Sequence, residues 1–527
     1  MENTLNARNK FVQFCSCLAI YLIAVLFALL SVGSILQTCR IDQANPYAEL
    51  VNFDNDFFLG NLALIGLSIL GALFLLRKNI SIGKVSTRFI VIVMLLVSTI
   101  ISLAWITLVR SIASGDAMIL LNTARDAAKN TYQSFHTSYD YYGNYSYYLF
   151  FPYQLGYVFF AEILYRIFGT ASSDILFQIP NVIALDFIYV GMVMIAKRLF
   201  QRRSVTNLTA ILLTLCFQPM FMTTFTYGIL LGLAFSVWSV YHVIRFIQDG
   251  KIVNAILAVV LMSVSVLLKY NNMIVMAAVC IALVLHIIDK KKLIAIAVVA
   301  AMILCPIGLQ KAVIASYAAR SGAELNKEVS QTMFAYMGIC DSGMAPGWWN
   351  AKAMEVLRDN HMDVEKANQI SSQGISDRMR ELTTSGQFFE FYKKKFLSQF
   401  NEPAYESIWL SQVRKHNYPE GEKLPAVVDS VYTGGLHKVL DIWFNYFTMM
   451  IFISFTAAMI WLIFKKKLNT AMLILPVTIL GAFFYHMMFE AKSQYILPYF
   501  ILMIPFAAYG FIESIRALHK KSDFLYQ

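Results

Sequence analysis

The chain has 527 residues, of which 58% are hydrophobic and only 14% are charged, and its mean hydropathy is +0.59. Soluble globular domains carry about a quarter charged residues, so this composition excludes that class and indicates an integral membrane protein. The net charge of +11 does not indicate nucleic-acid binding. The basic residues cluster in short loops between apolar runs, where membrane proteins carry them on the cytoplasmic side.

Apolar runs of about 20 residues recur along the chain, and this length crosses a hydrocarbon layer as a helix. The first run is too long for a signal peptide and lacks a small-residue cleavage site, so it is predicted to be a retained helix. We expect an all-α polytopic fold with about twelve transmembrane helices, whose runs begin near residues 12, 57, 89, 175, 206, 228, 252, 273, 293, 439, 469 and 493.

The basic clusters predict the orientation of these helices. If the N-terminus is cytoplasmic and the chain crosses the membrane twelve times, every basic cluster lies on the cytoplasmic side. Both termini then lie on that side as well. The clusters are Arg8–Lys10, Arg77–Lys84, Lys197–Arg203, Arg245–Lys251, Lys290–Lys292, Lys465–Lys467 and Arg516–Lys521.

This orientation requires that the apolar segment 147–169 does not cross, because one more crossing would move Lys197–Arg203 outside. The segment contains Pro152, Gln154 and Glu162, and its tyrosines suit the headgroup region, so we expect an interfacial or re-entrant helix. An ordinary thirteenth span with an inverted charge bias is the alternative.

Four regions follow from this topology. We expect an N-terminal two-helix addition (1–86), a transmembrane core with an outer loop at 111–172 (87–313), an extracytoplasmic loop or small domain (314–436), and C-terminal transmembrane helices (437–527). Cys39 and Cys340 both fall in outer loops, but no spacing framework predicts a disulfide between them.

Two acids stand in the first large outer loop. Asp116 comes directly after the third apolar run, and Asp126 follows ten residues later, nearly three helical turns away, so the two need not share a face. A solvated helix end is the simpler explanation for either acid alone.

Three more charges fall on the same outer surface. Lys269 lies in "LLKYNNMIV", and Glu490 and Lys492 lie in "FEAKSQYILPY", each at a short turn between apolar runs. Positive charge is disfavoured on this side of a membrane. A phosphate group at the membrane boundary would explain the two lysines, because lysine pairs with phosphate as a point charge.

Aromatic and amide side chains accompany these charges. Flat rings suit a sugar or an isoprenoid chain, although an interfacial aromatic belt explains them equally well. The candidate sugar or acceptor contacts, together with Glu490, are Tyr153, Gln154, Tyr495, Trp348 and Trp349. The histidines show no zinc-binding spacing, and no nucleotide-binding loop is present, so we expect neither metal nor cofactor.

The order of these features carries a resemblance. An acid after an early span, the segment "FPYQLGYVFFAEILYRIFG", the "LKYNN" turn and a late "EAKSQYILPYF" together resemble the GT-C superfamily of polytopic glycosyltransferases. The closest resemblance is to bacterial dolichyl-phosphate-mannose-protein mannosyltransferase-like enzymes of Gram-positive envelopes. It covers the chain from about Thr87 to the end. Many members carry a paired acidic motif in the first outer loop, whereas Gly115 precedes Asp116 here, which leaves the identity of a second acid open.

The resemblance implies transfer of one sugar, with inversion, from a polyprenyl-phosphate donor to an extracytoplasmic envelope polymer. Asp116, with Asp126 as a second candidate, would be the general base, and Lys269 and Lys492 would bind the lipid phosphate. An enzyme that makes the lipid-linked sugar is an expected partner. A lipid or polysaccharide transporter or flippase is the alternative, although no internal repeat of the kind common in transporters is visible. An envelope scaffold that binds through residues 314–436 is a second alternative.

Overall fold

The computed structural model describes residues 2–78, 80–139, 145–290, 292–325, 328–419, 421–465 and 468–525. Within these ranges the chain is helical apart from two short antiparallel hairpins. One pairs β1 (Gln37–Ile41) with β2 (Val51–Asn55), and the other pairs β3 (Ser138–Tyr139) with β4 (Tyr145–Ser146). This confirms the predicted all-α polytopic class.

Ten helices of the described chain are long and apolar enough to cross a membrane, or eleven if α8 (Arg203–Leu215) and the following bent segment form one span. The predicted run near residue 252 forms α11 (Ile252–Leu268), whose 17 residues span only about 26 Å. The ten helices are α1 (Glu2–Leu36), α2 (Phe58–Arg77), α3 (Thr87–Val109), α7 (Ile175–Phe200), α10 (Ile229–Asp249), α12 (Met273–Lys290), α13 (Ile294–Ser321), α20 (Gly435–Lys465), α21 (Thr470–Met488) and α22 (Leu497–Leu525).

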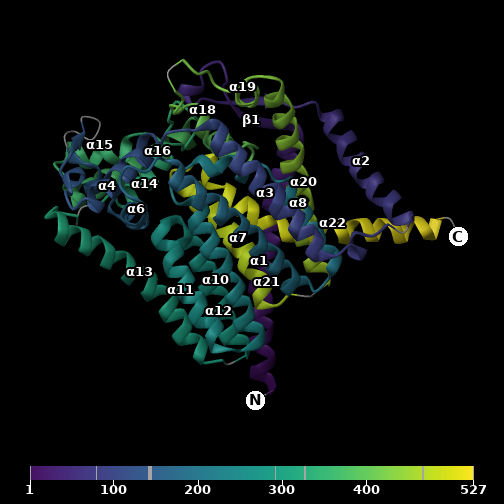
Figure 1. Ribbon diagram of the computed structural model, residues 1–527. Helices are drawn as coiled ribbons and strands as arrows, with labels where there is room; N and C mark the ends of the chain where they lie inside the picture. Colours follow the sequence, from purple (N-terminus) through teal and green to yellow (C-terminus); the bar gives the residue numbers. More distant parts are fainter. Residues whose placement is uncertain are drawn as a thin grey trace.

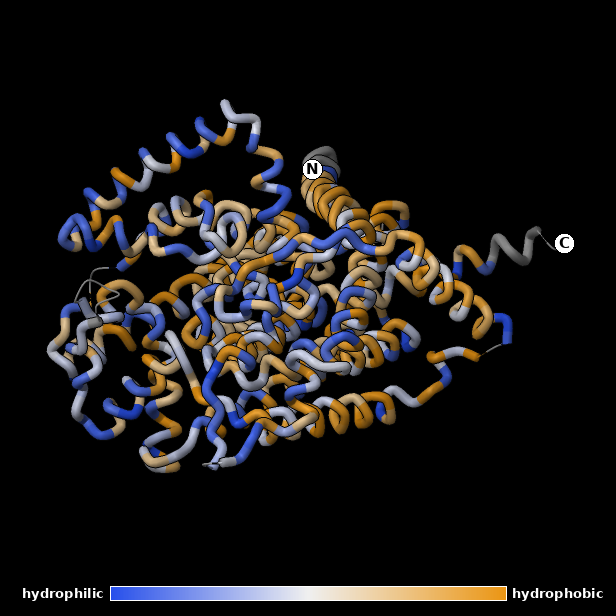
Figure 2. Tube along the Cα trace, turned by 90° about the horizontal axis from the view of Figure 1, so that it is seen from above, coloured by the Kyte–Doolittle hydropathy of each residue, from blue (hydrophilic) through white to orange (hydrophobic). Residues whose placement is uncertain are grey.

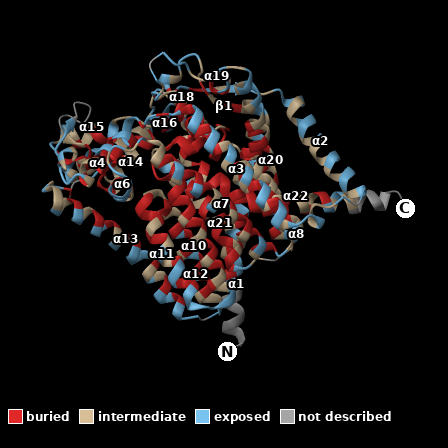
Figure 3. Cartoon of the chain, in the orientation of Figure 1, coloured by how far each residue is buried: buried red, intermediate tan, exposed pale blue. Residues whose placement is uncertain are grey.

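The long helices form one bundle whose apolar side chains pack inward. Its centre is buried, whereas α2 and α13 lie at the periphery (Figures 1 and 3). No residue in the most apolar stretch of α2 is buried. Hydrophobic residues predominate along the long helices (Figure 2), as expected for helices that face both neighbours and lipid.

The segment 147–169 is broken into short pieces. These are α5 (Tyr147–Phe150), a 3-10 turn at Pro152–Gln154, and α6 (Leu155–Phe168). With 14 residues, α6 is about 21 Å long, too short for a hydrocarbon core of about 30 Å. It is not among the helices that could cross, which agrees with the predicted interfacial helix.

Two glycines let the chain approach the end of α11. A Cβ on Gly156 of α6 would lie 1.8 Å from the Leu267 carbonyl oxygen, and one on Gly228, where φ is +80°, would lie 2.3 Å from the Leu268 carbonyl oxygen. Such distances are far inside van der Waals contact. The absence of side chains at these two positions therefore allows α6 and the start of α10 to pack against the turn that carries Lys269.

After α13, residues 328–419 and 421–434 fold mainly into short helices at the opposite end of the molecule from the N-terminus (Figure 1). These helices are α14 (Gln331–Gly338), α15 (Lys352–Asp359), α16 (Val364–Thr384), α17 (Phe388–Phe400), α18 (Trp409–Gln412) and α19 (Ala426–Tyr432).

The β1–β2 hairpin is bonded into this helical segment. The Cys39 and Val51 amides donate to the carbonyls of Asn401 and Met344, each at 3.0 Å. All seven cysteines are free, including Cys39 and Cys340. The hairpin is therefore held by backbone hydrogen bonds and packing, with no disulfide.

The orientation leads to a first prediction. Lys352 and Lys251 are exposed on loops or helix ends that the charge pattern assigns to opposite sides of the membrane. In a variant without the native cysteines, Lys352→Cys should react with an impermeant maleimide in intact cells, whereas Lys251→Cys should react only after lysis. The reverse pattern would mean that the chain is inserted the other way round.

Candidate active site

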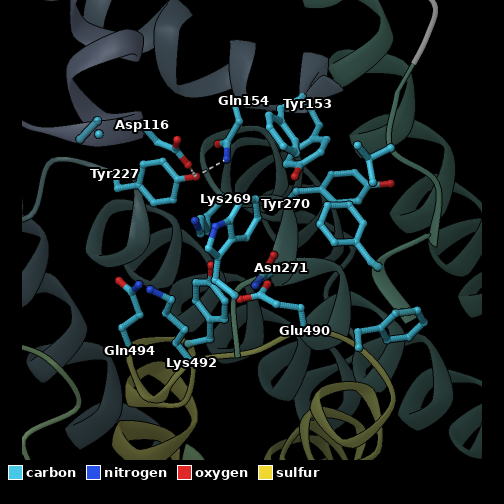
Figure 4. Close-up of a pocket in the computed structure, with 18 of the residues that line it drawn as sticks. Asp116, Tyr153, Gln154, Tyr227, Lys269, Tyr270, Asn271, Glu490, Lys492 and Gln494 are labelled. Carbon is cyan, nitrogen blue, oxygen red and sulfur yellow. Dashed lines mark hydrogen bonds between the residues drawn. The ribbon is translucent and has the colours of Figure 1, made fainter. Parts of the chain in front are cut away.

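A cavity of about 790 Å³ lies where α4 (Gly115–Ala128), the aromatic segment before α6, the turn between α11 and α12, and the segment before α22 meet. Its polar side is shown in Figure 4. The membrane helices α11, α12 and α13 contribute apolar lining residues, which are Val266, Met273, Met276, Pro306, Ile307 and Ile314. The cavity therefore joins a charged region to a surface suited to hydrocarbon.

Asp116 lies in the first turn of α4, where the helix dipole favours a negative charge. Tyr227 donates its hydroxyl to Asp116 Oδ2 at 3.0 Å, and Gln154 Nε2 donates to the Tyr227 oxygen at 2.5 Å (Figure 4). The carboxyl group is exposed to the cavity, and desolvation by the protein around the cavity raises the pKa of Asp116 above its usual range, against the opposing effects of Tyr227 and Lys269. A carboxylate with a raised pKa is a better proton acceptor than one in water.

Lys269 ends α11, and its ammonium group lies 3.8 Å from the centre of the Tyr227 ring and 5.8 Å from that of Tyr495. Burial lowers the pKa of Lys269 to about 7, although Asp116 and Glu490 oppose this shift. An anion bound nearby would favour the charged form of this lysine.

Glu490 and Lys492 follow α21 but have different surroundings. Burial raises the pKa of Glu490 to about 7, and its Oε1 atom is buried without a hydrogen-bond partner in the described part of the chain. Lys492 Nζ lies 2.5 Å from both carboxylate oxygens of Glu49. Burial lowers the pKa of Lys492, but Glu49 and Glu406 outweigh it and the pKa is raised.

Sequence reasoning missed the residues that hold this segment. Lys395 is fully buried and donates to the carbonyls of Gly338, Met487 and Phe489. Ser493 donates to Glu402 at 2.8 Å. The only signal in the sequence was Lys395 itself, which follows exposed Lys393 and half-buried Lys394 in a run of three lysines.

Most of the predicted site residues line this one cavity. They are Asp116, Tyr153, Gln154, Lys269, Trp349, Glu490, Lys492 and Tyr495. Their chemical roles remain predictions.

Asp126 and Trp348 are not brought to the cavity. Ten residues beyond Asp116, Asp126 lies about 15 Å along α4 and on another face. Its Oδ2 atom accepts hydrogen bonds from the Ser134 amide at 3.1 Å and hydroxyl at 2.5 Å. Trp348 is fully buried, and its Nε1 atom donates to Ser398 Oγ at 3.0 Å. Core packing explains Trp348, and its neighbour Trp349 faces the cavity instead.

Among the described residues, no three His, Cys, Asp or Glu side chains gather in a way that could hold a metal ion. That the chemistry needs no metal remains a prediction.

Residues 155–309, from α6 into α13, match the family model described as dolichyl-phosphate-mannose-protein mannosyltransferase. The matched range includes Lys269 and all of the apolar lining residues of α11, α12 and α13 except Ile314, but neither Asp116 nor Glu490. No curated protein shows significant sequence similarity to the chain. Together with the helical bundle, the family match supports a membrane glycosyltransferase of the GT-C type.

Proposed function

We propose that the protein moves one sugar from an undecaprenyl-phosphate type of donor to an extracytoplasmic acceptor of the cell envelope, such as a cell-wall polysaccharide or a teichoic acid, with inversion. One observation carries this proposal. A carboxylate, a half-buried lysine and apolar side chains from membrane helices line a single cavity. Such a cavity has room for a polar sugar, a phosphate and the start of a lipid chain.

Asp116 would activate the acceptor. An acceptor hydroxyl that attacks the anomeric carbon must lose its proton, and a carboxylate within hydrogen-bond reach can accept it. The new bond joins the acceptor oxygen to the anomeric carbon while the bond from that carbon to the phosphate oxygen breaks. Tyr227 and Gln154 form the chain of hydrogen bonds that orients Asp116, so they act as positioning residues.

Lys269 would stabilise the departing lipid phosphate. The phosphate gains negative charge as the bond breaks, and a cation fixed in a site with little water stabilises that charge effectively. Lys492 is less available because Glu49 already holds it at 2.5 Å. We therefore assign the phosphate first to Lys269 and give Lys492 a mainly structural role.

The sugar would lie against Glu490 and the neighbouring aromatic rings. The free Oε1 atom of Glu490 is a natural acceptor for a sugar hydroxyl, since an unpaired buried carboxylate oxygen is costly. Tyr153, Tyr495 and Trp349 also line the cavity and offer flat faces to the sugar. The external segment 328–436 contributes much of the rim and would contact the acceptor.

The first test concerns Asp116. Asp116→Asn keeps the size of the side chain but removes its basicity, so turnover should fall about 10²–10⁴-fold with donor binding retained. Asp126→Asn, on the same helix but away from the cavity, should change turnover little. The measurement is release of polyprenyl phosphate and labelling of acceptor by the purified protein in lipid. A transporter would release no polyprenyl phosphate, and activity lost only in Asp126→Asn would mean that the base is Asp126.

A second test separates structure from phosphate binding at Lys492. Removing one member of a buried ion pair costs about 3–5 kcal/mol, because the other charge is left unpaired. Lys492→Met should therefore lower the melting temperature strongly, and the double variant Glu49→Gln with Lys492→Met should recover most of the loss together with donor affinity. A double variant that is stable but no longer binds the donor would mean that Lys492 binds the lipid phosphate after all.

A third test uses pH. The charged form of Lys269 is lost as pH rises through a pKa of about 7, and the carboxylate of Asp116 is lost as pH falls. The profile of kcat/KM should be bell-shaped with an alkaline limb near pH 7. The alkaline limb of the kcat profile should lie at a higher pH than that of kcat/KM, because bound phosphate favours the charged form of Lys269. Lys269→Arg should abolish the alkaline limb; an unchanged limb in this variant would exclude Lys269 as its origin.

A further inference from the structure

Arg414 follows α18 and lies in the wall of the same cavity. The residue is only 7% exposed, and its guanidinium carbon stands 4.8 Å from the centre of the Phe225 ring. Its Nη1 atom is buried without a hydrogen-bond partner, and within the described ranges no carboxylate forms an ion pair with it. Sequence reasoning did not single out this residue.

Half-buried arginines elsewhere in the described chain can be paired with a carboxylate. Arg320, for example, lies 2.8 Å from a carboxylate oxygen of Glu162. Asp174 is the carboxylate whose charge acts on the pKa of Arg414, which it raises. Its Oδ2 atom already accepts a hydrogen bond from the Ala113 amide at 2.6 Å. Burial lowers the pKa of Arg414 to about 10, so the side chain is still charged at neutral pH. A buried cation without a partner is costly, and a cavity beside it gives an anion access.

The position of Arg414 relative to the proposed reaction centre is also informative. Phe225 and Tyr227 stand 5.3 Å apart, with Arg414 over Phe225 and Lys269 over Tyr227. Two cations thus flank one pair of aromatic rings, and the Tyr227 hydroxyl reaches Asp116.

We infer that Arg414 binds a phosphate group of a substrate inside the cavity. The planar fork of an arginine matches two phosphate oxygens at once, which lysine cannot do. This inference rests on the proposed function, because that function brings phosphate into the cavity. The phosphate belongs either to the lipid donor or to a phosphate-containing acceptor polymer. Arg414 lies outside residues 155–309, so the family match does not extend to it.

The experiment measures binding separately from turnover. The full chain in lipid nanodiscs is titrated with undecaprenyl phosphate, with uncharged undecaprenol and with a poly(glycerol phosphate) oligomer, and affinity is followed by the shift in melting temperature. Arg414→Met removes the charge at similar length. Lys415→Gln is the matched control, because Lys415 is the next residue, is exposed and lies outside the cavity wall.

Arg414→Met should lower the affinity for one of the two phosphate ligands about tenfold or more, as expected for the loss of a charge-assisted contact. Lys415→Gln should leave both affinities unchanged. Lower affinity for undecaprenyl phosphate would mean that Arg414 binds the phosphate of the donor. Lower affinity for the oligomer would mean that it binds a phosphate of the acceptor. Without ligand, Arg414→Met should be as stable as the parent chain or more stable, since an uncompensated buried charge is gone. Arg414→Lys should bind with intermediate affinity.

Unchanged affinity for both phosphate ligands in Arg414→Met would overturn the inference. So would a variant that unfolds, because that result would make Arg414 a structural residue. The proposed reaction is tested independently. If the parent chain transfers no sugar yet binds phosphate through Arg414, the phosphate site stands and the reaction assignment fails.

Discussion

Asp116 and Lys269 meet around one tyrosine, and the rest of the site depends on this arrangement. Tyr227 donates to the carboxylate and presents its ring to the ammonium group, so both charges are held without forming a direct ion pair. Desolvation shifts the pKa of each group toward its neutral form, and the attraction between the two charges opposes that shift. The two glycines that face the end of α11 allow this close packing. The proposed proton acceptor and the proposed phosphate-binding cation thus line the same cavity.

Contacts between segments distant in the sequence support this centre. Glu49 has a left-handed backbone, with φ at 53°, and holds Lys492 across a sequence separation of 443 residues. Trp409 donates to the Pro46 carbonyl at 2.7 Å, which fixes the turn that carries Glu49. Backbone strain at such a position persists only where the surroundings enforce it. The hairpin between the first two membrane helices, β1–β2, therefore contributes to the site through Glu49, although it lies far from the rest of the cavity in sequence.

The sequence predicted the helical bundle and much of the cavity for identifiable reasons. Apolar length predicts membrane helices regardless of packing, and lysines on the side where positive charge is disfavoured pointed to Lys269 and Lys492. Asp126 and Trp348 do not line the cavity, and residue type alone does not reveal which face of a helix or loop a side chain takes. Glu49, Lys395 and Arg414 were missed since their importance arises from contacts between distant segments. α11 was counted with the full-length spans because its apolar run continues into the next helix after only a short turn.

The central claim is that this cavity binds a sugar linked to a lipid phosphate. The most direct measurement is an experimental structure of the full chain in lipid with a non-transferable analogue of a polyprenyl-phosphate sugar. The account predicts density for the phosphate within hydrogen-bond distance of Lys269 or Arg414, for the sugar between Asp116 and Glu490, and for the lipid chain against the apolar wall formed by α11, α12 and α13. Density for the analogue elsewhere on the protein, with this cavity empty at saturating analogue, would contradict it.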